Sequence, residues 1–119
     1  TTSKVMIYDF EFRKNIKKKK LYEAIAKEIL NAWDAKTPSE IKKRFLHLAK
    51  KYHPDINHKE SAKKKFHDIS LSYRILTQWD DSILNEKFST ISEFDVKIIK
   101  IKANINDEKS HIERFKNLY

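Results

Sequence analysis

The segment best suited to do chemistry is His53-Pro54-Asp55, which follows a lysine-rich stretch of this 119-residue chain. Pro54 fixes its own φ angle and disfavours helix at His53, so the motif predicts a rigid turn at the end of a helix. In such a turn Asp55 would present a carboxylate that can accept two hydrogen bonds from a partner's arginine. Taken alone, the motif also fits an ordinary helix end, with a C-terminal His, a stopping Pro and a turn Asp.

The composition excludes most catalytic sites. The chain has no cysteine, which removes thiol catalysis, disulfides and cysteine-held zinc, and no glycine, which removes glycine-rich phosphate loops and nucleophile elbows. Its five histidines lack the spacing of a metal site, and no His-Glu-x-x-His motif occurs. The sequence therefore predicts a binding module rather than an enzyme, with no catalytic residue, no metal and no cofactor.

The charge and the first residue bear on where the chain works. Its 26 lysines and arginines outnumber 17 acids, a formal net charge of +9, and no stretch is apolar enough to span a bilayer. Because the chain starts with Thr1, we expect that either an initiator Met or a longer presequence has been removed. These features favour the mitochondrial matrix over the cytosol, although a general bias toward lysine would also explain part of the charge.

Two amphipathic helices should flank the motif. Residues 37–40, Thr-Pro-Ser-Glu, form a capping box with Pro in the first turn, so a helix should run from there to about Tyr52. Apolar residues over 59–78 alternate spacings of four and three and match the stripe of the preceding helix, which predicts an antiparallel hairpin. The expected fold class is therefore all-α.

Shorter helices are expected on either side of this hairpin. One covers residues 21–31, where Asn31 suits the left-handed conformation that ends a helix, and another covers 82–88. A long amphipathic helix should begin near Ser92, with Asp95 as its capping-box partner. Its heptad-like stripe could pack on the domain, but it exceeds what a short hairpin can cover. A partner helix is therefore expected to contact Ile98, Ile101, Ile105, Ile112 and Phe115.

The first 13 residues alternate large apolar and polar side chains, a pattern typical of an extended segment. Because a lone strand is unstable in water, this segment should lie in a groove of its own domain or on a partner, with contacts through Tyr8, Phe10 and Phe12. The run Lys17–Lys20 could bind a polyanion or simply begin a solvated helix. The expected organisation is an extended attachment segment over 1–20, a domain over 21–80 and a helical extension over 81–119.

The sequence around the His-Pro-Asp motif resembles a known family, the J domains. SEIKKRFLHLAKKYHPD at residues 39–55 is similar to the second helix and loop of a J domain, and KKFHDISLSYRILT at 64–77 is similar to the third helix. EILNA at 28–32 matches the end of the first helix. The resemblance covers roughly residues 21–78, and the two patterned helices make the His-Pro-Asp motif specific.

The resemblance implies a fold, a partner and a site. J domains dock on the seventy-kilodalton heat-shock chaperone and stimulate its ATP hydrolysis. The basic second helix meets an acidic surface of the ATPase domain, and the loop engages the nucleotide-domain and linker region. By position, the contacts are expected at Lys42, Lys43 and Lys50 on the helix and at His53, Pro54, Asp55 and Asn57 in the loop.

The chain departs from the family pattern at several positions. Leu46 and His47 stand where basic residues are usual, which thins the docking patch, and Asn31 replaces the customary glycine. The residues after Leu76 match the usual fourth helix poorly, and neither a Gly/Phe-rich linker nor a cysteine-rich zinc module follows. The terminal segments are therefore expected to replace a client-binding region.

Three functions are compatible with the sequence. The first is a J-domain co-chaperone tethered by its terminal segments to a further protein partner. The second is a structural accessory subunit of a large mitochondrial complex, in which the J fold serves as scaffold. The third is nucleic-acid binding through the basic residues, which is disfavoured because no aromatic residues are interleaved with the basic run as a stacking platform requires.

Overall fold

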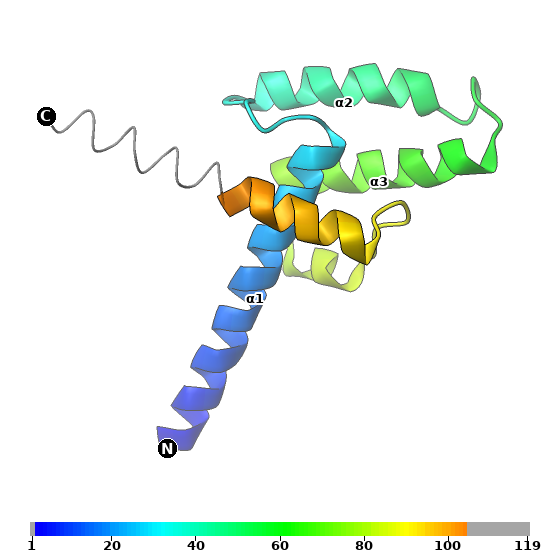
Figure 1. Ribbon diagram of the computed structural model, residues 1–119. Helices are drawn as coiled ribbons and strands as arrows, with labels where there is room; N and C mark the ends of the chain where they lie inside the picture. The colour runs from blue at the N-terminus through cyan, green and yellow to red at the C-terminus, as the bar shows by residue number, and fades with distance from the viewer. Residues whose placement is uncertain (1, 105–119) are drawn as a thin grey trace, which may run out of the picture.

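The computed structural model describes the backbone of residues 2–104 and the side chains of residues 13–104, all of it helix or connection (Figure 1). The elements are α1 (Thr2–Ile29), α2 (Pro38–Tyr52), α3 (Glu60–Thr77), the 3-10 helix η1 (Asp81–Asn85) and a further helix over 93–104. The expected all-α class and the hairpin of α2 and α3 are confirmed. Within the described residues, no helix combines the length and apolarity needed to cross a membrane.

The N-terminal segment is helical, so the predicted extended conformation is wrong for residues 2–20. α1 runs without a break from Thr2 into the predicted first helix, and its N-terminal half projects away from the other helices (Figure 1). A lone strand would have no neighbour to satisfy its backbone hydrogen bonds. A helix docked at one end can instead extend residue by residue, and neither glycine nor proline interrupts this stretch.

The predicted helix ends around α2 are confirmed. The Thr37 hydroxyl accepts the backbone N–H of Glu40 at 3.2 Å, and the Glu40 carboxylate accepts the backbone N–H of Lys36 at 2.8 Å. Asn31, just after α1, has φ 52°, the left-handed conformation expected there. His53 ends α2 in an extended conformation, with φ −61° and ψ 135°, as the following proline requires.

α3 is the central element, because it packs against α2 on one side and α1 on the other. Toward α2, Ile69 joins Leu30 and Ala32 in a buried cluster that Phe45 and Leu48 of α2 cover. Every residue of α2 keeps some exposure, so this helix lies on the outside of the domain with its far face open to solvent.

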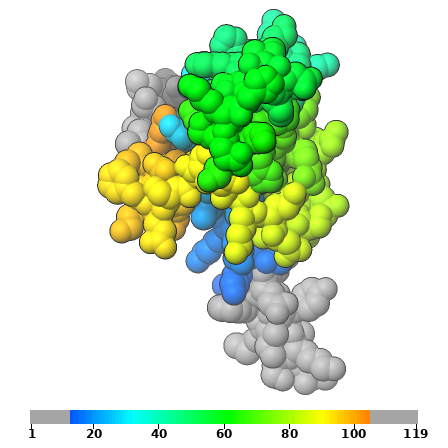
Figure 2. Space-filling view, turned by 90° about the vertical axis from the view of Figure 1, so that its right-hand side faces the viewer, coloured from blue at the N-terminus to red at the C-terminus, as the bar shows by residue number. Residues whose placement is uncertain are grey.

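The second side of α3 forms a separate core with α1 and η1. Leu71 and Ile75 of α3 close on Ala26 of α1 and on Ile83, which is fully buried. η1 stands where a helix over 82–88 was predicted, but it is a 3-10 helix that ends at Asn85. Figure 2 shows how the side chains of α3, η1 and the following connection form one continuous face beside α1.

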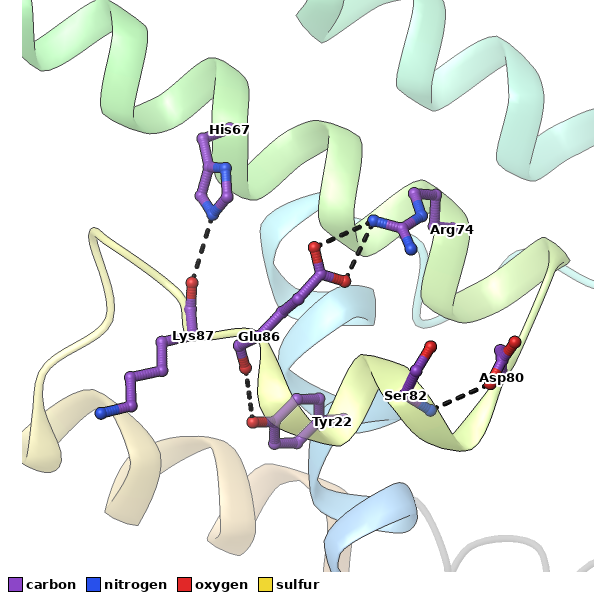
Figure 3. Close-up of polar contacts among 7 residues, drawn as sticks. All are labelled: Tyr22, His67, Arg74, Asp80, Ser82, Glu86 and Lys87. Carbon is purple, nitrogen blue, oxygen red and sulfur yellow. Dashed lines mark hydrogen bonds and ion pairs between the residues drawn. The ribbon is translucent and has the colours of Figure 1, made fainter.

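Polar contacts hold the connection after η1 against α1 and α3 (Figure 3). The Tyr22 hydroxyl donates to the backbone carbonyl of Glu86 at 2.8 Å, and Arg74 lies 3.0 Å from the carboxylate of the same residue. At the next residue of the connection, the backbone carbonyl of Lys87 lies 3.2 Å from Nε2 of His67 in α3. Glu86 thus joins two helices to one connection, through its main chain and its side chain.

A buried carboxylate fixes the next turn of this connection. Asp68 of α3 is 1% exposed and accepts the backbone N–H groups of Ser89 and Thr90, each at 2.7 Å, and the Thr90 hydroxyl. A buried charge needs such a shell of donors. The shell therefore determines where the chain turns from α3 toward the last described helix.

The helix over 93–104 begins at the predicted capping box. Asp95 accepts the backbone N–H of Ser92 at 2.9 Å, and the Ser92 hydroxyl accepts the backbone N–H of Asp95 at 3.1 Å. The helix crosses α1 (Figure 1), and Ile99, 2% exposed, packs into a cluster with Ala24 and Ile25. This part of the extension is therefore docked on the domain.

Glu28 anchors the far end of this helix to α1. Its carboxylate accepts hydrogen bonds from the Trp33 indole at 2.7 Å and from Lys102 at 2.9 Å. Burial raises the pKa of Glu28, but these two hydrogen bonds and the charge of Lys102 more than offset it, so the pKa lies below its ordinary value. A carboxyl with a lowered folded-state pKa stabilises the fold above its unfolded-state pKa, and that stability disappears as the pH falls through the folded-state value.

We expect acid to loosen the 93–104 helix through Glu28. As the pH falls below the ordinary glutamate range and through the lowered pKa of Glu28, the neutral carboxyl no longer holds Lys102, so Trp33 should become more exposed and its fluorescence should shift to longer wavelength. Glu28→Gln should show the shift already at neutral pH and lose about 1 kcal/mol of unfolding free energy. Glu93→Gln, at the start of the same helix, is the matched control, and an equal effect from both variants would contradict the assignment.

Candidate functional site

The His-Pro-Asp loop is ordered by its own histidine. The backbone N–H of Asp55 donates to Nδ1 of His53 at 3.1 Å, and the backbone N–H groups of Ile56 and Asn57 donate to the His53 carbonyl at 3.0 and 2.8 Å. The His53 ring also meets Phe66 of α3 edge-on, with centroids 5.3 Å apart. The loop is therefore a compact turn pinned to the start of α3.

The histidine contacts define one tautomer. Nδ1 of His53 also lies 3.6 Å from an Asp55 carboxylate oxygen, a distance at which a protonated ring would form an ion pair. The shorter contact with the backbone N–H makes Nδ1 an acceptor, so the proton of the neutral ring resides on Nε2. That N–H remains available to donate to a partner.

Asp55 is the most accessible charge of the loop. Its side chain is 89% exposed, while Pro54 is half-buried and holds the turn in place. Asn57 points elsewhere, because its side-chain oxygen accepts the backbone N–H of Lys59 at 3.3 Å, just before α3. Of the four expected loop contacts, His53 and Asp55 present their functional groups outward, and Asn57 ties the loop to the next helix.

The expected basic contacts lie on the outer face of α2. Lys42, Lys43 and Lys50 are exposed, and no ion pair engages them among the described side chains. Lys42 lies about 12 Å from Lys50 along the helix axis, at about 1.5 Å per residue. Lys50 adjoins the loop, whereas Lys42 and Lys43 extend the positive surface toward the start of α2.

An apolar groove adjoins the loop, and sequence reasoning missed it. Its volume is about 450 Å³, and it unites Lys50, His53 and Asp55 of the expected site. Two exposed apolar residues, Leu46 and Ile56, stand at its edges, 44% and 71% exposed. The sequence signal was Leu46 itself, an apolar residue off the core stripe of α2. The remaining lining residues are Phe45, Ala49 and Phe66.

Two further contacts hold α2 in this orientation. Arg44 donates to the Asn31 carbonyl and lies 3.2 Å from the Asp34 carboxylate, and its hydrogen bond holds the pKa of Asp34 below the ordinary value. On the core side Phe45 stacks on Tyr73 of α3, with centroids 4.3 Å apart. The basic face and the loop therefore move with the body of the domain.

The residues expected to contact a further partner are only partly described. Ile98 and Ile101 are 48% and 61% exposed, which leaves them accessible. Tyr8, Phe10 and Phe12 lie within α1, and their side chains are outside the described set. Ile105, Ile112 and Phe115 lie outside the described residues.

This arrangement of helices and loop agrees with a family comparison. The model of the DnaJ domain matches residues 20–83, more than half of the chain, including α2, the loop, α3 and most of η1. The chain therefore belongs to the DnaJ domain family, as the resemblance implied. Family membership supports a co-chaperone role, and domains of this family are generally not enzymes.

Curated relatives carry the same domain within much longer chains. DnaJ homolog 1, mitochondrial, of Saccharomyces cerevisiae is 58% identical over 41 residues, which are 34% of this chain and 8% of the relative. Chaperone protein DnaJ of Staphylococcus aureus is 43% identical over 67 residues, 56% of this chain and 16% of the relative. Chaperone protein DnaJ of Erysipelothrix rhusiopathiae is 46% identical over 50 residues, 42% of this chain and 14% of the relative. No solved structure gives a significant match.

Proposed function

We propose that this chain docks on a seventy-kilodalton heat-shock chaperone and stimulates its ATP hydrolysis through the His-Pro-Asp loop, while its terminal segments tether it to a further protein. The observation that carries the proposal is the loop itself, a compact turn with an 89% exposed Asp55 side chain beside a basic helix face. It is supported by membership of the DnaJ domain family.

The physical roles of the residues differ. Lys42, Lys43 and Lys50 steer an acidic partner surface toward α2 and raise the association rate more than the affinity. His53 and Asp55 then supply directed hydrogen bonds, of which the carboxylate can accept an arginine with two parallel contacts. The chain itself makes and breaks no bond, so its effect is on the conformation of the partner.

The proposal is tested by single-turnover ATP hydrolysis with a cognate seventy-kilodalton chaperone, in the presence of the full chain or of its His53→Gln variant. Glutamine cannot reproduce the ring contact with Phe66 or the acceptor for the Asp55 amide, so the loop loses its shape. We expect the wild type to stimulate and the variant to fall to near the unstimulated rate, a loss of at least about tenfold.

His58→Gln is the matched control, because His58 is exposed in the same connection and its side chain takes part in none of the hydrogen bonds that shape the loop. This variant should stimulate like the wild type. Stimulation that persists in His53→Gln, or a folded wild-type chain that gives none, would contradict the proposed activity.

A scaffold role in a large complex is the second candidate. It is favoured by α1, whose 28 residues extend well beyond the family match that begins at residue 20. In this case the J fold would act as a packed subunit, and stimulation would be lacking even with an intact loop. Co-purification of the chain with a stable assembly, together with no stimulation, would favour this function.

A further inference from the structure

The helix over 93–104 is apolar on two opposite sides. Val96, Ile99 and Ala103 face α1 and belong to its buried cluster. Phe94, Ile98 and Ile101 recur at spacings of four and three on the other side, roughly 170° away at about 100° per residue. A surface helix normally has one apolar side, and a helix that is apolar all round is normally buried all round.

The second side is open in the domain. Phe94 is 69% exposed, and Ile98 and Ile101 are about half exposed or more. Their spacing, i, i+4 and i+7, is the pattern by which one amphipathic helix contacts another. We call these three residues the outer stripe.

The charges beside the outer stripe that are not already used are mostly basic, and the one acidic exception is Glu93, which is exposed at the start of the helix. Asp95 is held by Ser92, and Lys102 is held by Glu28 at 2.9 Å. Lys97 and Lys100 are exposed and form no ion pair with a described side chain.

A cleft extends this basic border onto α1. Lys100 lines it together with Lys17 and Lys20, and its volume is about 230 Å³ at the crossing of the two helices. Leu21 and Ala24 supply apolar lining, so the cleft combines positive charge with apolar surface. A segment docked on the outer stripe would meet positive charge along one side.

We propose that the outer stripe docks an amphipathic helix of a different protein that carries acidic residues beside its own apolar stripe. A second copy of this chain is a poor occupant, because it would present the same exposed Lys97 and Lys100 beside its own stripe, and two chains of net charge +9 repel each other. An acidic border instead complements Lys97 and Lys100. This inference rests on the proposed tethering role and specifies its partner.

Two synthetic helices about three heptads long provide the probes. Both have leucine at a and d; one has glutamate at e and g, and the other has lysine. Fluorescence anisotropy should show that the full-length chain binds the glutamate peptide at least about tenfold more tightly than the lysine peptide at low salt, because the borders of opposite charge attract.

Three double variants locate the interaction. Ile98→Ser with Ile101→Ser should weaken binding of the glutamate peptide at least about tenfold through lost apolar burial. Lys97→Glu with Lys100→Glu should weaken it about threefold or more. The control Lys59→Glu with Lys64→Glu has the same charge change elsewhere and should stay within about twofold.

Several results would overturn the proposal. These are equal binding of the two peptides, binding unchanged by the serine variant, dimerisation of the wild type through the outer stripe in sedimentation experiments, or binding to phosphatidylglycerol vesicles that the serine variant abolishes. ATPase stimulation by the serine variant, and by Lys97→Glu with Lys100→Glu, should equal that of the wild type. A failed peptide experiment with intact stimulation therefore rejects only the helix partner, and the reverse result rejects only the chaperone role.

Discussion

Replacing Asp68 by Ala is expected to lower the free energy of unfolding by roughly 3 kcal/mol, a large share of the 5–15 kcal/mol typical of a small domain. The carboxylate is 1% exposed and accepts hydrogen bonds from the backbone N–H groups of Ser89 and Thr90. Alanine removes these acceptors and leaves a small cavity. Because Ser89 and Thr90 are themselves exposed, water can partly replace the lost acceptor, which keeps the expected loss from being larger.

Urea denaturation followed by circular dichroism measures this effect. Thr90→Val is the matched control, because it removes only the hydroxyl donor to Asp68 and should cost about 1 kcal/mol. Asp68→Asn should fall between the two, since its amide keeps one acceptor but turns an N–H₂ toward the remaining donors. A loss below about 1 kcal/mol for Asp68→Ala would show that the connection over 86–91 is held mainly by its apolar contacts.

Local signals in the sequence were sufficient for the hairpin. Thr37, Pro38 and Glu40 fix the start of α2 through short-range hydrogen bonds, and Pro54 fixes its end through sterics. Asn31 ends α1 as its type suggests. Each of these devices acts within one turn of helix, so each can be recognised without the rest of the fold.

The N-terminal segment was predicted wrongly because alternation describes only which residues are apolar. The same apolar residues can lie on a helix, and the choice depends on whether a neighbouring strand exists. The N-terminal segment is also continuous with the part of α1 that is docked on the domain. Extending an existing helix by one residue costs less than starting a new one. Neither condition is visible in residues 1–13 alone.

The second side of α3 was also missed, although it holds the most consequential polar residue of the core. Leu71 and Ile75 lie outside the predicted apolar stripe of this helix, and their spacing of four already indicated another apolar face. The predicted stripe consists of Ala62, Phe66, Ile69, Tyr73 and Leu76. Asp68 lies beside the face of Leu71 and Ile75, and from the sequence alone an acid there would be predicted to be exposed to solvent. Its role depends on donors about 20 positions away in the chain, and such a pairing is set by the tertiary fold.

The sequence predicted the charged residues of the candidate site but not the groove beside them. Lys50, His53 and Asp55 meet at one groove, and Leu46 and Ile56 give that groove an apolar edge. The sequence suggested only that Leu46 removes a positive charge. An exposed apolar residue can interrupt a basic face or border a groove. Which of the two it does depends on the residues of the loop and of α3 that lie next to it.

Asp55→Asn should abolish ATPase stimulation and leave the stability of the fold within about 0.5 kcal/mol of the wild type. The Asp55 side chain is 89% exposed, and the ion-pair partner of its carboxylate within the described residues is His53, at 3.6 Å. Asparagine keeps its size and the backbone N–H that donates to Nδ1 of His53. It removes the charge and one of the two acceptors that an arginine of the partner would need, which should cost at least about tenfold in stimulation.

Asp68→Ala provides the complementary control for this variant. Measured at a temperature where both proteins remain folded, Asp68→Ala should stimulate like the wild type because Asp68 hydrogen-bonds Ser89 and Thr90 and makes no hydrogen bond with the loop. Asp55→Asn should show the opposite pattern, with normal unfolding and no stimulation. If Asp55→Asn stimulates normally while the chain is folded, the loop carboxylate is not the contact, and the exposed lysines of α2 and the adjoining groove would have to carry the docking.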